Sequence, residues 1–197
     1  MNYAAALLAL LLVPASGISD TRITEVGKDR FEADFASGGS LRIKVRPAGV
    51  RIFGGDDNKI LVRYEGDNAD QVKNVKVRLE TTGTRGELEV SGGPRSEFRI
   101  LIQIPRTTSV HVRVPAGDLA VEGIVGDKDV ELNAGGLVLQ AGDPLQYASV
   151  EASVTAGGLN AGRFDVAKGG LFRSFKRLGP GRYRLHAHVG AGDLTLK

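Results

Sequence analysis

The sequence contains no cysteine among its 197 residues. This excludes disulfides, thiolate metal sites, a cysteine nucleophile and lipid attachment through a cysteine. A lack of cysteine is also compatible with an oxidising compartment, where an unpaired thiol is a hazard. Tryptophan is absent too, and aromatic residues make up only 6% of the chain, whereas glycine occurs 27 times. This composition predicts many short strands joined by tight turns.

Long apolar runs are also missing, except for one short run near the start of the chain. Residues 4–13 (AAALLALLLV) are apolar, but they would span only about half of a ~30 Å bilayer core. Small residues follow at Ala15-Ser16-Gly17, as they do before a signal-peptidase cleavage site. We therefore expect a signal peptide over residues 1–19, with cleavage near residues 15–19, and an exported protein in the periplasm, at the cell surface or secreted. Because Met1-Asn2-Tyr3 carries no positive charge, a buried N-terminal strand or helix is the alternative.

The rest of the chain, residues 20–197, is long enough for a single domain with its own core. Apolar and polar residues alternate over residues 41–45, 75–79, 98–104 and 110–114, and turns containing glycine separate these segments. Alternation with a period of two is typical of strands with one buried face. We expect antiparallel strands over about residues 20–115, with at most one turn of helix at residues 68–72.

A short phrase, small–Gly–(Asp or Gly)–Leu, recurs after Pro115. Its five leucines stand 18, 22, 12 and 23 residues apart, and they are Leu119, Leu137, Leu159, Leu171 and Leu194. Glycine allows a sharp corner with a positive φ, and aliphatic residues after each corner can stack into a continuous core. The repeat predicts an all-β fold in which the antiparallel strands lead into a Gly-cornered β-solenoid, with Leu119, Leu137, Leu159 and Leu194 stacked inside. An ordinary sandwich with Gly-rich hairpins is the alternative.

These residues resemble the bacterial "putative adhesin" β-solenoid domain family of the cell envelope. Residues 50–54 with 59–62 are similar to the opening hairpin of that family, residues 112–115 to its turn into the solenoid, and the Gly-Asp-Leu phrases to its rungs. The resemblance covers nearly the whole of residues 20–197 and implies an envelope location and an adhesin-like role. Its motifs describe an architecture and include no catalytic signature.

The charge of the chain is uneven, although its net value is only +3. Residues 163–184 hold seven cations and one anion, Asp165, which gives +6 there and leaves −3 for the rest. We predict an anion-binding patch of Arg163, Lys168, Arg173, Lys176, Arg177, Arg182 and Arg184. Residues 172–182 are predicted to form a loop, in which Phe172 and Phe175 either contact a partner or cap the end of the solenoid.

Other candidate sites are weaker. His186 and His188 share one face of a strand, but the sequence offers no third ligand near them, so no metal site is expected. Acidic turns at Asp56-Asp57 and Asp127-Lys128-Asp129 are expected to be solvated and to bind no calcium. The sequence has no Gly-x-Ser-x-Gly, no phosphate-binding loop and no His-Glu-x-x-His, so we expect neither an enzyme nor a cofactor.

The sequence therefore predicts a non-catalytic, exported envelope protein that acts as an adhesin-like scaffold or binding module. The candidate partners are an envelope macromolecule, an anionic lipid and an acidic polysaccharide, the last two bound through residues 163–184. Nucleic acid is not expected, because the chain is not uniformly basic. The remaining alternative is a glycan-active β-helix enzyme that would use paired carboxylates such as Glu87 and Glu89.

Overall fold

The computed structural model describes residues 20–27, 29–46, 49–66, 69–94 and 98–197. The expected signal peptide lies outside these residues. The described chain is all-β, with short 3-10 helices and no α-helix. Its strands are β1 (Asp20–Val26), β2 (Arg30–Asp34), β3 (Ser40–Val45), β4 (Gly49–Gly55), β5 (Lys59–Glu65), β6 (Lys76–Thr82), β7 (Arg85–Ser91), β8 (Arg99–Pro105), β9 (Ser109–Ala116), β10 (Leu119–Glu122), β11 (Lys128–Leu139), β12 (Tyr147–Ala161), β13 (Val166–Leu178) and β14 (Tyr183–Leu196). The 3-10 helices are η1 (Ala69–Asn74), η2 (Pro144–Gln146) and η3 (Gly162–Phe164).

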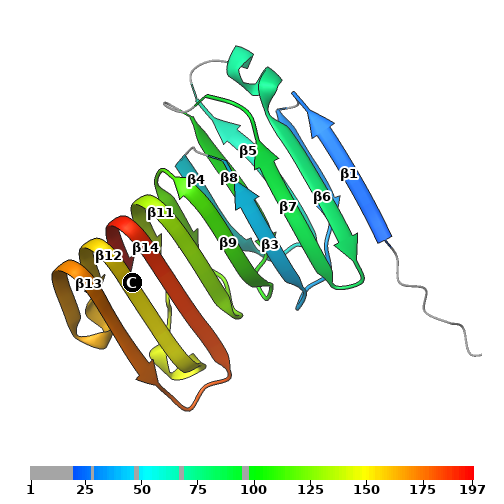
Figure 1. Cartoon of the computed structure of the whole chain (residues 1–197). Coiled ribbons are helices and arrows are strands. Elements are labelled where there is room, and N and C mark those ends of the chain that lie inside the picture. The colour runs from blue at the N-terminus through cyan, green and yellow to red at the C-terminus, as the bar shows by residue number, and fades with distance from the viewer. Residues whose placement is uncertain (1–19, 28, 47–48, 67–68, 95–97) are drawn as a thin grey trace, which may run out of the picture.

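The strands form one sheet that folds over on itself and nearly closes, like a barrel. Its hydrogen-bonded order is β1-β6-β7-β3-β9-β11-β10-β4-β8-β5-β2. The sheet branches at β11, which also pairs with β14, and β12 and β13 follow β14 along this branch. In Figure 1 the strands β1, β6, β7, β3 and β9 make one layer, and β4, β5 and β8 lie behind it. The long strands β11, β14, β12 and β13 curl at their ends in the same view and so contribute to both layers.

The prediction of antiparallel strands before residue 115 is only partly correct, because the sheet is mixed. β3 pairs in parallel with both β7 and β9, and β4 pairs in parallel with β8, whereas β1–β6, β6–β7, β2–β5 and β5–β8 are antiparallel. The predicted opening hairpin is also absent as such, since β8 lies between β4 and β5. Consecutive strands such as β3 and β4 lie in opposite layers. A strand therefore pairs with a later strand that returns to the same layer in the same direction. The chain that connects two such parallel strands crosses from one end of the sheet to the other.

The four predicted leucines stack in register, as expected. Leu119 pairs with Leu137, Leu137 with Leu194, and Leu194 with Leu159, and each is at most 1% exposed. Their order in space differs from the order in the sequence, because β14 lies between β11 and β12.

Glycine is required at the corner before these leucines. Gly135 has a φ of 131°, and a Cβ there would lie 2.0 Å from the backbone oxygen of Gly117 on the neighbouring strand. Only glycine lets two backbones approach this closely.

The core is built from the inward residues of the alternating segments. Ile100, Ile102 and Ile104 of β8 are at most 1% exposed, as the period-two pattern predicts. A polar pair is buried with them: Lys128 is 2% exposed, and its Nζ donates to the hydroxyl of Tyr147 at 2.7 Å. The prediction of a solvated turn at residues 127–129 is thus wrong at Lys128, which begins β11 instead.

No helix in the described ranges is long and apolar enough to cross a membrane.

Candidate functional site

The strand β13 ends the sheet and combines exposed apolar side chains with cations. Among the described strands it pairs only with β12. Leu171, Phe172 and Leu178 are 63%, 80% and 72% exposed, and elsewhere in the described ranges the exposed large hydrophobic residues are Val26 and Leu145. Apolar side chains gathered on a surface mark interaction sites more often than scattered ones do. We call residues 166–178 the β13 edge and take it as a candidate binding surface.

The predicted loop over residues 172–182 is largely a strand. Residues 172–178 belong to β13, and only residues 179–182 connect it to β14. β13 lacks the alternation seen in the other strands because it has a neighbour on one side only and lies at the end of the core. Most of its residues are consequently exposed on both faces, and no period-two pattern is needed.

The seven predicted cations lie on four different parts of the chain. Lys168, Arg173, Lys176 and Arg177 lie on β13, and Arg163 lies in η3, which contacts β13. Arg182 belongs to the connection after β13, and Arg184 lies on β14. The structure therefore brings five of the seven to the end of the sheet.

Three of these cations have hydrogen-bonding partners that differ in charge. Lys168 Nζ donates to the backbone oxygen of Ser174 at 2.9 Å, and Arg173 Nε donates to that of Gly169 at 2.7 Å. Lys176 Nζ instead forms an ion pair with Glu151, 2.6 Å from Oε1. A carbonyl satisfies a donor without cancelling its charge, so Lys168 and Arg173 leave the β13 edge positive.

The two phenylalanines of the segment have different roles. Phe175 is partly buried, and its ring lies 5.5 Å from that of the buried Phe164. The guanidinium of Arg177 lies 5.9 Å from the Phe164 ring centre. Phe175 therefore caps the end of the core, whereas Phe172 is exposed and has a φ of 52°. A bulky residue in this left-handed region is strained, which makes Phe172 a candidate for a functional role.

A second candidate surface runs across the sheet as a row of polar side chains. Neighbouring strands from β1 to β13 place these residues side by side: Arg22, Glu80, Glu87, Arg42, His111, Asp129, His186, Glu151 and Lys176. We call this set the polar row. Beside it lies His188, next to Glu131 in register, so all three histidines of the sequence share one face.

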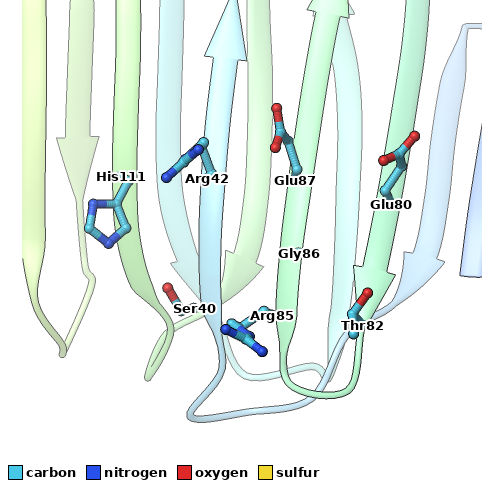
Figure 2. A pocket seen from close by; sticks show the side chains of 8 residues that line it. All are labelled: Ser40, Arg42, Glu80, Thr82, Arg85, Gly86, Glu87 and His111. Carbon is cyan, nitrogen blue, oxygen red and sulfur yellow. The ribbon is translucent and has the colours of Figure 1, made fainter. Parts of the chain in front are cut away.

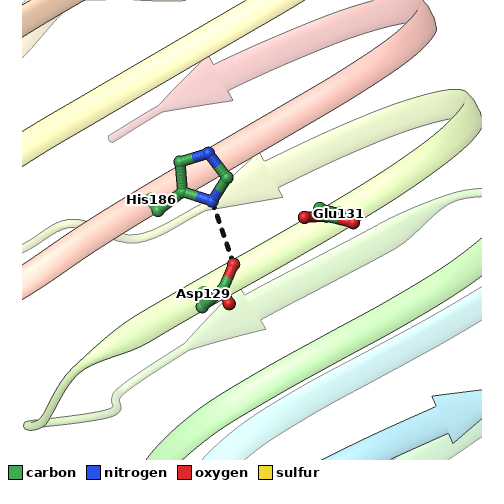
Figure 3. A group of neighbouring side chains, drawn as sticks. All are labelled: Asp129, Glu131 and His186. Atoms are coloured by element: carbon green, nitrogen blue, oxygen red, sulfur yellow. Dashed lines mark hydrogen bonds and ion pairs between the residues drawn. The ribbon is translucent and has the colours of Figure 1, made fainter.

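Asp129 lies between two histidines of the polar row, and Figure 3 shows its hydrogen bond to one of them, His186. Its Oδ1 lies 2.9 Å from His186 Nδ1, its Oδ2 lies 3.1 Å from His111 Nδ1, and Arg113 donates to Oδ2 at 2.9 Å. Partial burial alone would raise the pKa of Asp129. The hydrogen bonds from Arg113, His186 and His111 outweigh that effect and hold its pKa well below the usual range. Asp129 is therefore an anion that orients two histidines.

The structure gathers a different set of possible metal ligands around His186, without His188, and also places a competitor beside them. Asp129, Glu131 and His186 each place a ligand atom within 4.8 Å of the others. However, Arg113 already forms ion pairs with both carboxylates, at 2.9 Å each. A metal ion would have to displace this guanidinium, so the cluster is better described as an ion-pair network.

Sequence reasoning missed the polar row. The alternation of Asp129 and Glu131, and of His186 and His188, predicts that each pair faces outward. It does not predict that β11 and β14 are neighbours, because that pairing joins residues 57 apart. The strand order, rather than any local motif, creates this surface.

Comparisons with known proteins support the fold only. A scan with models of protein families finds no match, and a search of curated proteins finds none either. The chain is similar to the crystal structure of a putative cell adhesion protein from Clostridium sporogenes, with a TM-score of 0.53 and 13% identity. The match covers 92% of this chain and 100% of that one. At this identity the likeness shows a shared all-β architecture.

Proposed function

We propose that the protein is a non-catalytic, adhesin-like binding module of the cell envelope that attaches to an anionic lipid surface through its β13 edge. The observation that carries the proposal is the gathering of exposed apolar and cationic side chains on this one terminal strand. The proposed export rests on the apolar run at residues 4–13. We interpret the parallel stack β10-β11-β14-β12 as rungs of a short solenoid that β13 terminates.

The chemistry of the β13 edge favours lipid over other acidic partners. A cation close to an anionic membrane contributes about 1 kcal/mol, and the attraction falls off within a Debye length of ~8 Å at physiological salt. Leu171, Phe172 and Leu178 add apolar area that the headgroup region can cover. An acidic polysaccharide would engage the cations but would leave most of this apolar area in water.

Co-sedimentation with vesicles tests the proposal. Residues 20–197 are mixed with vesicles of phosphatidylglycerol in phosphatidylcholine, at low and at high salt, and with vesicles of phosphatidylcholine alone. We expect binding to the anionic vesicles that weakens as salt rises. The double variant Lys168→Glu plus Arg173→Glu should lose most of the electrostatic part, and Phe172→Ser should weaken binding without changing its salt dependence.

Matched control variants lie at a distance from β13. Val26→Ser removes an exposed apolar side chain from β1, at the opposite end of the sheet order, and Arg63→Glu reverses an exposed cation on β5. Both should bind vesicles like the unaltered protein. Equal binding by the β13 variants and the controls, or salt-dependent binding to an acidic polysaccharide but not to vesicles, would contradict the proposal.

The alternative of a glycan-active enzyme has little geometric support. Glu87 and Glu89 are half-buried on the outward face of one strand, β7, at positions two residues apart rather than on opposite sides of a cleft. Glu87 also forms an ion pair with Lys44 at 2.6 Å. Incubation of the purified protein with envelope polysaccharides should release no shorter fragments, and any measurable turnover would reverse this conclusion.

A further inference from the structure

A groove of about 530 Å³ lies on the polar face, on the neighbouring strands β6, β7, β3 and β9. Figure 2 shows the side chains that line it: Ser40, Arg42, Glu80, Thr82, Arg85, Gly86, Glu87 and His111. The register of the paired strands explains why these side chains lie together. Ser40 of β3 is the cross-strand partner of Arg85 of β7, and Arg42 lies beside both Glu87 and His111.

The two carboxylates of the groove are neutralised by cations outside it. Glu80 forms ion pairs with Arg22 and Arg78. Glu87 accepts from Lys44, although Arg42 is its direct neighbour in register. Neither carboxylate therefore needs a cation from within the groove.

The two arginines of the groove, in contrast, have no ion pair or hydrogen bond through their side chains to any other part of the described chain. Arg42 and Arg85 are exposed and project from neighbouring strands. The hydroxyls of Ser40 and Thr82 are further donors beside them. The groove therefore offers two guanidinium groups without an ion pair, and two hydroxyls beside them, to a ligand that carries a negative charge.

We propose that this groove, the Arg42–Arg85 groove, binds a carboxylated sugar of an acidic polysaccharide. A planar guanidinium donates two parallel hydrogen bonds to a carboxylate, and such charge-assisted pairs are stronger and more directional than neutral ones. Hydroxyl side chains suit the many hydroxyls of a sugar. The groove is open and shallow on the sheet, so a polymer can cross it without an end having to enter.

The groove is separate from the β13 edge. In the sheet order, β11, β14 and β12 lie between β9 and β13. The inference therefore goes beyond the proposed attachment to lipid, and each can fail alone. If both hold, the protein can bridge a lipid surface and an acidic glycan.

Isothermal titration calorimetry with a defined oligomer of galacturonic acid tests the groove. A neutral glucose oligomer of the same length, a sulfated dextran and inorganic phosphate serve as comparison ligands. We expect the carboxylated oligomer to bind in a salt-dependent way and the neutral oligomer not to bind. Arg42→Gln and Arg85→Gln should each weaken binding about tenfold, the loss typical of one charge-assisted pair.

The control variant is Arg63→Gln, which removes an exposed arginine from β5 in the other layer. It should bind the galacturonate oligomer like the unaltered protein, and unchanged melting temperatures show that all three variants are folded. The proposal is overturned if the groove variants bind as tightly as this control, if the galacturonate oligomer does not bind, or if only the sulfated polymer or phosphate binds.

Discussion

The leucine of the same sequence phrase is buried in one strand and exposed in the neighbouring strand. In β12 the phrase Gly157-Gly158-Leu159 turns a tight corner and buries its leucine to 1% exposure. In β13 the phrase Gly169-Gly170-Leu171 leaves its leucine 63% exposed. The two strands pair directly with each other, so their surroundings differ mainly in what lies on the far side.

The two leucines differ in exposure because β12 and β13 differ in the number and in the direction of the strands beside them. β12 lies between β14, to which it is parallel, and β13, to which it is antiparallel. In the parallel pair Leu159 meets Leu194 in register, whereas in the antiparallel pair Leu171 meets Ala156. The phrase thus encodes a corner, but a strand buries the leucine only where parallel neighbours bring equivalent positions together. Substitutions in the inner strands and in β13 can test this difference.

The largest effect is expected from Gly157→Ala compared with Gly169→Ala. Gly157 has a φ of 138°, and a Cβ there would lie 1.8 Å from the backbone oxygen of Gly192. The backbone strain alone costs about 1–3 kcal/mol, and separating the two strands adds to it. A Cβ added at Gly169 would meet no atom within 4 Å, so the Gly169 variant should unfold like the unaltered protein. Chemical denaturation of both variants measures the difference, and equal stabilities would show that the two corners are equivalent.

The next effect concerns the leucines themselves. Leu137→Ala removes a side chain that is 1% exposed and paired with two other leucines, and it should cost ~2–5 kcal/mol in the free energy of unfolding. Leu171→Ala should change this free energy by less than ~0.5 kcal/mol, as is usual for surface substitutions. Thermal unfolding of the two variants side by side provides the measurement. A large loss for Leu171→Ala would mean that β13 is packed as tightly as the inner strands.

A smaller effect contrasts a buried lysine of β11 with an exposed lysine of β13. Burial lowers the pKa of Lys128 to about 8, against an ordinary value of 10.5. Between these two values the unfolded chain binds more protons than the folded one, so stability should rise with pH, by about 1–2 kcal/mol from about pH 7.5 to about pH 9.5.

Two lysine variants test whether Lys128 causes this rise of stability with pH. Lys128→Met should abolish it, whereas Lys168→Met, on the exposed β13, should preserve it. Urea denaturation across the pH range provides the measurement, and a rise that survives in Lys128→Met would assign the effect to another group.

The smallest expected effect is a gain in stability. Phe172 is exposed with a φ of 52°, so Phe172→Gly relieves strain and should raise the free energy of unfolding by ~1 kcal/mol or less. The same variant should bind anionic vesicles less well, because it loses apolar contact with the lipid. Denaturation and co-sedimentation of one preparation measure both changes. A variant that gains stability and keeps full vesicle binding would leave Phe172 without a role at the surface.

Local patterns in the sequence predicted much of the chain correctly. Period-two alternation identifies the buried faces of strands such as β8, because successive side chains of a strand point to opposite sides. The Gly-x-Leu phrase locates the corners and selects Leu119, Leu137, Leu159 and Leu194 as core residues. The excess of cations in residues 163–184 is likewise visible without a structure.

Strand order was decided by the tertiary structure alone. Nothing local places β14 between β11 and β12 or makes β3 parallel to both of its neighbours, because these pairings join distant segments whose inward faces are equally apolar. That order sets Asp129 between His111 and His186, leaves Arg42 and Arg85 without an ion pair, and puts β13 at the end of the sheet. The sequence by itself identified the inward faces of the alternating strands and the glycine corners, since both patterns involve neighbouring residues along the chain. The burial of Lys128 and the exposure of Leu171 were decided by the strands around them. Which exposed residues meet on the surface depends on contacts between strands far apart in sequence, and only the folded sheet supplies them.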